Sequence, residues 1–101
     1  MTAGKRFPGL PDVPTVIEAG VPAYDVASWN ALAAPAKTPP AILDKVHAAL
    51  VSALAAPEVQ KRFTELGVEG RASTPQELRN FYASETKRWT QVVERAGIPK
   101  Q

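Results

Sequence analysis

The chain has 101 residues, 45% of them hydrophobic and 22% charged, a composition typical of at most one small globular domain. The absence of cysteine excludes disulfides and thiolate metal sites. No stretch approaches the roughly 20 apolar residues of a membrane-spanning helix. Twelve basic and ten acidic side chains give a net charge of +2. Because the two signs are interspersed, the sequence predicts no nucleic-acid-binding face.

A proline-rich arm occupies residues 1–37. Its prolines Pro8, Pro11 and Pro14 follow one another at a spacing of three. Each proline disfavours the helical conformation of the residue before it. The spacing therefore predicts an extended, polyproline-like path.

A short helical turn is expected directly after these prolines, over residues 16–19. Thr15 can cap this turn, and Glu18 stands three residues later as the second half of a capping box. Gly20 supplies a left-handed stop, and Pro22 prevents the helix from resuming.

One to three short strands are expected. Residues 24–29 alternate between apolar and polar or small side chains, and residues 31–34 can continue as a buried strand. Residues 68–72 predict a further short strand or an extended connector. So few strands do not make a sheet that is stable alone. The sequence thus predicts part of a fold, or a protomer that a partner completes.

Two amphipathic helices are predicted after the arm. Thr38 is the expected N-cap of the first, with Pro39 at the first helical position and an end near Ala55. Pro57 opens the second helix, which is expected over residues 58–66. Gly67 is its expected C′ residue, and both helices have apolar residues at helical spacing.

A third and longer helix follows. Thr74 and Glu77 form a complete capping box, with Pro75 at the first helical position. Gly97 is expected to stop this helix. Glu85 lies on its apolar stripe and is expected to form an ion pair with Arg88. The prediction is a helix-rich α/β chain with three main helices in residues 38–101.

No catalytic constellation is present in the sequence. His47 is the one histidine, and the neighbouring Ser52 lies five residues away on another helix face, so no nucleophile–base pair is predicted. A single histidine without cysteines does not predict a metal site, and no glycine-rich phosphate loop is present. The sequence therefore predicts that the chain is not an enzyme. We expect no catalytic residues, no metal and no cofactor.

Ser28, Trp29 and Asn30 are the candidate ligand-binding residues. Trp29 ends the predicted strand between two short hydrogen-bonding side chains. Such an arrangement can line a cleft for a small polar ligand. Packing alone also explains all three residues, and this alternative stays open.

An ordered series of short motifs gives the chain a family resemblance. The series resembles the tripartite tricarboxylate transporter substrate-binding proteins, which are TctC-like or Bug receptors, over nearly the whole chain. Two departures from their pattern are visible: Ala56 stands where an aspartate N-cap is common, and Asn30 replaces an aromatic residue after the tryptophan. The motifs are Leu10-Pro11-Asp12-Val13-Pro14-Thr15, Glu18-Ala19-Gly20, Ser28-Trp29, residues 34–40, residues 55–59, Leu66-Gly67, residues 74–77 and Ala96-Gly97-Ile98.

The resemblance implies a two-lobed periplasmic-binding-protein fold that closes on small carboxylates. Residues 1–101 would be a single partial domain that corresponds to the C-terminal third of such a receptor. The resemblance also implies a membrane transporter as partner and a periplasmic location. Residues 1–6 lack the apolar core of a signal peptide, so we expect no export signal in this sequence.

Two functions follow as alternatives. The first is a non-catalytic receptor for small carboxylates, of which this chain would be a fragment. The fragment alone is expected to bind citrate-like acids negligibly, because half of the cleft is missing. The second is a stand-alone helical module with no ligand, which self-associates as a homo-oligomer or an arm-exchanged dimer. Amphipathic helices without a sheet leave an apolar surface that favours such association.

Overall fold

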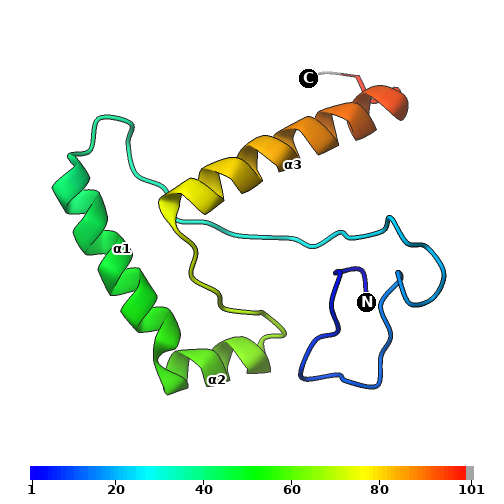
Figure 1. Cartoon of the computed structure of the whole chain (residues 1–101), viewed down its shortest axis with the longest axis horizontal. Coiled ribbons are helices and arrows are strands. Elements are labelled where there is room, and N and C mark those ends of the chain that lie inside the picture. The colour runs from blue at the N-terminus through cyan, green and yellow to red at the C-terminus, as the bar shows by residue number, and fades with distance from the viewer. Residues whose placement is uncertain (100–101) are drawn as a thin grey trace. The chain divides into compact units, whose positions relative to one another are not determined.

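The computed structural model describes residues 1–99 (Figure 1). The chain divides into two compact units, one over Met1–Arg71 and one that begins at Ala72. No helix of the described residues has the length and apolar character needed to cross a membrane. The helices of the first unit are α1 (Pro40–Ala55) and α2 (Pro57–Glu65), and the helix of the second is α3 (Pro75–Arg95).

Helix α1 begins one residue later than predicted. Its N-cap is Pro39, with φ −58° and ψ 139°, and no side chain caps it, so the prediction of Thr38 as N-cap is wrong. Pro39 precedes Pro40, and a residue before proline is held in the extended region. Pro39 therefore stays outside the helix, and its carbonyl accepts the first hydrogen bond, from the Ile42 N–H at 3.0 Å.

The ends of α2 and α3 agree with the sequence signals. A proline occupies the first position of each helix. The glycines that follow them, Gly67 and Gly97, have φ of +70° and +66°, the left-handed region expected of a C′ residue. At α3 the Thr74 hydroxyl accepts the Glu77 N–H at 3.1 Å, and the Glu77 carboxylate accepts the Thr74 N–H at 2.9 Å. The predicted capping box is confirmed.

A tight corner joins α1 to α2, and the two helices contact each other. Ala56 forms the corner with extended φ −66° and ψ 130°. The Gln60 side-chain amide donates to the Leu54 carbonyl at the end of α1 and, at 3.1 Å, to the Gly70 carbonyl. One side chain of α2 thus fixes both the helix before it and the connector after it.

The expected strands are absent: none of the residues 1–99 forms a strand, including 24–29, 31–34 and 68–72. The first residues of the arm do lie beside two other segments. The Met1 carbonyl accepts the Val16 N–H at 2.8 Å, and the Thr2 carbonyl accepts the Val26 N–H at 2.8 Å. A strand needs a ladder of such bonds, and these contacts do not extend into a ladder anywhere in residues 1–99.

The proline spacing produces turns instead of the predicted polyproline path. The Leu10 N–H donates to the Phe7 carbonyl at 2.9 Å, and the Val13 N–H donates to the Leu10 carbonyl at 3.1 Å. Pro8 and Pro11 stand at the second position of these two consecutive turns, where the fixed φ of proline is favoured. The arm is therefore folded back on itself and not extended in this part.

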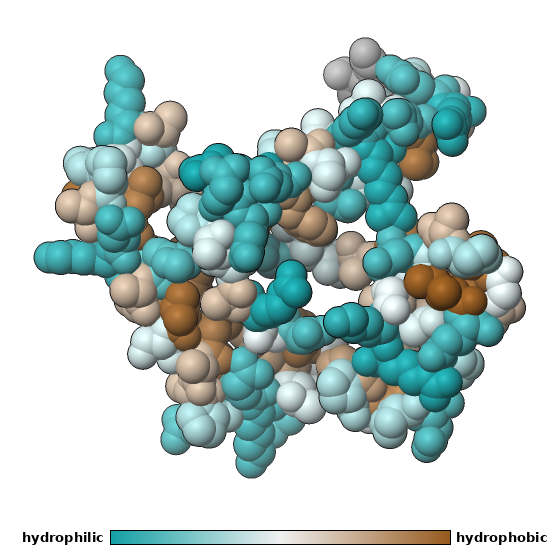
Figure 2. All heavy atoms as spheres, viewed as in Figure 1, coloured by the Kyte–Doolittle hydropathy of each residue, from teal (hydrophilic) through white to brown (hydrophobic). Residues whose placement is uncertain are grey.

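No apolar side chain of residues 1–99 is fully buried. Thr15 is the one buried residue among them, at 3% exposed. Apolar atoms accordingly appear on the surface in Figure 2. The apolar helix faces that the periodicity predicted to pack inward are solvent-exposed or half-buried, and they include Ile42 and Val46 of α1, at 51% and 47% exposed.

Candidate functional site

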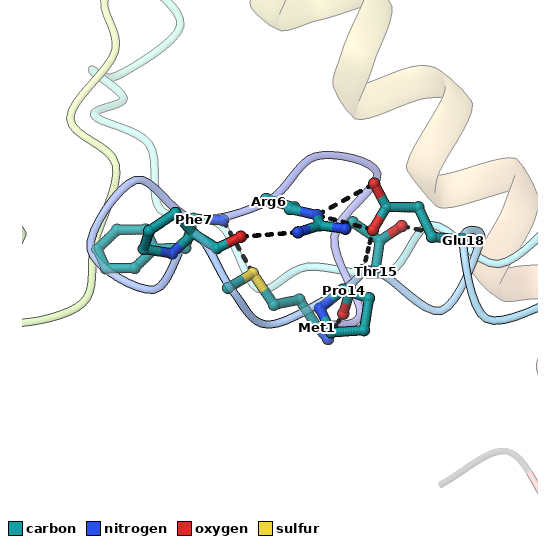
Figure 3. Close-up of polar contacts among 7 residues, drawn as sticks. Met1, Arg6, Phe7, Pro14, Thr15 and Glu18 are labelled. Carbon is teal, nitrogen blue, oxygen red and sulfur yellow. Dashed lines mark hydrogen bonds and ion pairs between the residues drawn. The ribbon is translucent and has the colours of Figure 1, made fainter.

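The best-defined polar structure of the arm is the capped turn at Thr15. The Thr15 hydroxyl accepts the Glu18 N–H at 3.1 Å, and the Glu18 carboxylate accepts the Thr15 N–H at 3.0 Å (Figure 3). The Ala19 N–H donates to the Thr15 carbonyl at 3.1 Å, which closes one helical turn. Gly20 has φ +110°, as a left-handed stop requires. The predicted capping box is confirmed here as well.

Arg6 extends this capped turn into a cluster. Its Nε donates to Glu18 Oε2 at 2.8 Å, and its Nη1 donates to the Pro11 carbonyl at 2.8 Å (Figure 3). The Thr15 N–H and, after it, the Arg6 guanidinium lower the pKa of Glu18 below its ordinary value. Sequence reasoning missed Arg6, because no local signal links residues twelve positions apart.

The first residue is also tied to this cluster. The Met1 amine donates to the Pro14 carbonyl at 2.7 Å, and the Phe7 N–H points at the Met1 sulfur at 2.8 Å (Figure 3). Together with the bond from Val16 to the Met1 carbonyl, these contacts hold residues 1–6 against the capped turn. The arrangement is a scaffold of backbone and side-chain bonds, with Glu18 already occupied by its partners.

The predicted ligand residues lie in a different part of the arm. Ser28, Trp29 and Asn30 follow one another in the non-helical segment between the turn at 21–24 and α1. All three are solvent-exposed, and Trp29 is 39% exposed. The structure brings them together only as chain neighbours, and their role in ligand binding stays a prediction.

The rest of the described chain offers no competing site. His47 is half-buried in α1, and residues 1–99 contain no group of three side chains that could hold a metal ion. On α3 the predicted pairing of Glu85 with Arg88 is confirmed at 3.5 Å. Glu85 also accepts the Trp89 indole N–H at 3.0 Å, and the Arg88 guanidinium lies 5.7 Å from the Trp89 ring centroid. These contacts give Glu85 a structural role.

Known proteins resemble this chain over nearly its whole length. Residues 1–98 match the family described as "Tripartite tricarboxylate transporter family receptor". A protein from the tcbD–tcbE intergenic region of a Pseudomonas species is 35% identical over 94 residues, and Protein BugT of Bordetella pertussis is 34% identical over 92. These matches cover 92% and 91% of this chain but only 28% of each relative.

A solved structure matches as well. "R. palustris Rpa4515 with adipate" is 34% identical with a TM-score of 0.80, and the match covers 95% of this chain and 32% of that one. The chain therefore matches part of the fold of that protein. The chain belongs to the tripartite tricarboxylate transporter receptor family. This is a family of solute-binding transport receptors and not of enzymes, and the chain spans under a third of the length of these relatives.

Proposed function

We propose that this chain is the C-terminal part of a periplasmic receptor that captures small carboxylates and delivers them to a membrane transporter. One observation carries the proposal: at 34% identity, nearly all of the chain superposes on about a third of a protein that was solved with adipate. The receptor would bind the carboxylate reversibly and leave it chemically unchanged. In such a receptor, two lobes would close around the ligand by a hinge motion.

We further propose that Ser28, Trp29 and Asn30 lie next to the ligand in the complete receptor. Short polar side chains and backbone N–H groups suit carboxylate oxygens, and an exposed tryptophan supplies an apolar wall for a carbon chain. The solvent exposure of all three residues supports this role. Glu18 is a poor candidate, because its negative charge would repel the ligand.

A chimera tests this proposal. Residues 1–99 would replace the matching third of the R. palustris receptor, and adipate binding would be measured by calorimetry. The chimera is expected to bind adipate, and this chain alone is expected to release no binding heat. Ser28→Ala, Trp29→Ala and Asn30→Ala should each weaken binding, whereas Asp44→Ala on α1 is the control. Unchanged affinity in all three variants would remove these residues from the site.

The exposed helix faces favour a second candidate function, a self-associating module. Ile42, Val46 and Val51 are 51%, 47% and 39% exposed along α1, and exposed apolar surface of this kind promotes association. Light scattering of this chain distinguishes the two functions. A dimer that dissociates on Val46→Lys supports self-association, and a cooperatively folded monomer contradicts it.

A further inference from the structure

Asp25 connects the beginning of the chain to the segment that holds the candidate ligand residues. Its Oδ1 accepts the Gly4 N–H at 2.7 Å, across 21 residues of sequence. The next residue makes a second bond in the same direction, because the Val26 N–H donates to the Thr2 carbonyl at 2.8 Å. Residues 25 and 26 are thus held at two adjacent points, and Ser28 follows two positions after Val26.

The contact at Gly4 leaves no room for a side chain while the Asp25 carboxylate keeps its place. A Cβ at this position would lie 2.6 Å from Asp25 Oδ2 and 2.9 Å from Asp25 Cγ. Both distances are shorter than a carbon atom tolerates, so any side chain at residue 4 would push the carboxylate away. The bond itself is of the stronger kind, since a backbone N–H donates to a side chain that carries a charge when ionised.

The segment to which Asp25 is attached is itself anchored. Arg6 pairs with Glu18 at 2.8 Å, and the Val16 N–H donates to the Met1 carbonyl at 2.8 Å. Residues 1–6 therefore lie between the capped turn on one side and residues 25–26 on the other. Because residues 1–6 are themselves held in place, the bond from Gly4 to Asp25 can fix the position of residues 25–26. A bond to a freely moving segment could not do so.

We propose that Asp25 is a positioning residue: through the Gly4 amide it fixes the backbone that presents Ser28, Trp29 and Asn30. The proposal rests on the proposed function, because it concerns the same three residues. It adds that the orientation of these side chains depends on a carboxylate that does not itself touch the ligand. Asp25 would thus influence ligand capture from outside the ligand site.

The experiment uses the full chain in a Trp89→Phe background, so that Trp29 is the remaining tryptophan. Asp25→Ala is expected to accelerate hydrogen exchange of the Gly4 amide by about tenfold, the factor for losing one hydrogen bond to a charged group. It should also make the Trp29 fluorescence easier to quench with acrylamide. Gly4→Ala should have the same effect on quenching. Asp25→Asn keeps an oxygen acceptor and should restore part of the protection.

The control is Asp44→Ala, which removes a carboxylate from α1 and should change neither measurement. Faster Gly4 exchange with unchanged Trp29 quenching in Asp25→Ala would overturn the proposal, and so would unchanged Gly4 exchange. Neither measurement uses a ligand. If the chimera shows no role for Ser28, Trp29 and Asn30 while these results hold, the proposed ligand-binding role of the three residues fails and the positioning by Asp25 stands.

Discussion

Arg6 and Glu18 form an ion pair across twelve residues of sequence, with Nε 2.8 Å from Oε2. The same carboxylate caps the turn at Thr15. Both charged side chains are nearly half exposed, at 44% and 45%, so solvent screens their attraction and the pair alone adds little stability. Its importance is geometric, because Glu18 joins the first residues of the arm to the capped turn.

The capped turn should weaken in acid. The Thr15 N–H and Arg6 lower the pKa of Glu18, so the folded loop favours the ionised carboxylate. The resulting stability is present above the pKa of an unfolded glutamate, about 4.3, and is lost as the pH falls through the lower folded value. The Thr15 amide shift should therefore titrate with a midpoint below the ordinary pKa of glutamate. In Glu18→Gln this titration should vanish, and its persistence would assign it to another group.

Removal of the α3 cap should destabilise that helix. Thr74→Ala deletes the hydroxyl that accepts the Glu77 N–H, and the expected cost is about 1 kcal/mol of helix stability. Circular dichroism at 222 nm during urea unfolding measures the loss. Thr74→Ser retains a hydroxyl and should stay close to the parent. Equal losses in both variants would show that the methyl group, and not the cap, matters.

A new cap at Ala56 should stabilise α2. Ala56 is the N-cap of this helix and has no side chain that can accept a hydrogen bond. Ala56→Asp is expected to add about 1 kcal/mol of stability, since Asp and Asn are among the best N-caps. Ala56→Asn provides a cap without a negative charge. Comparison of the two variants therefore separates the stabilisation by the cap hydrogen bond from that by the charge at the helix N-terminus. Thermal unfolding measures both, and no gain in either variant would contradict the prediction.

Loss of Glu85 should loosen the polar cluster on α3. Its carboxylate accepts the Trp89 indole N–H and pairs with Arg88. Glu85→Ala is expected to cost about 1 kcal/mol, the net value of one hydrogen bond. In a Trp29→Phe background, the Trp89 emission should shift as its indole N–H turns to water. Glu94→Ala removes a carboxylate from the same helix and is the matched control. An identical emission shift there would exclude a specific role of Glu85.

The helices could be predicted because their signals are local. Thr74, Glu77 and Gly97 determine the ends of α3 through bonds that span a few residues, and the capped turn at Thr15 and Glu18 follows the same rule. The pairing of Glu85 with Arg88 is equally local. At these positions the feature depends on residues within one helical turn, and the sequence pattern was sufficient.

Features that depend on distant partners or on equivalent local solutions were not predictable. A residue before proline is non-helical both in a polyproline path and at the first position of a turn, so Pro8 and Pro11 fit either structure. The expected strand at 24–29 needed a ladder that the described residues do not form. The contacts of Arg6 with Glu18 and of Asp25 with Gly4 span 12 and 21 residues, and no motif indicates them.

The prolines of the arm also bear on the pairing of its backbone with other chains. Leu10, Val13 and Val21 are 56%, 41% and 49% exposed, and exposed apolar residues beside free backbone groups can recruit other chains into intermolecular sheets. A proline stands immediately beside each of them, at positions 11, 14 and 22. Proline has no N–H to donate to a growing sheet. The residues that bend the arm therefore also withhold N–H donors from an intermolecular sheet, which is the property of gatekeeper positions.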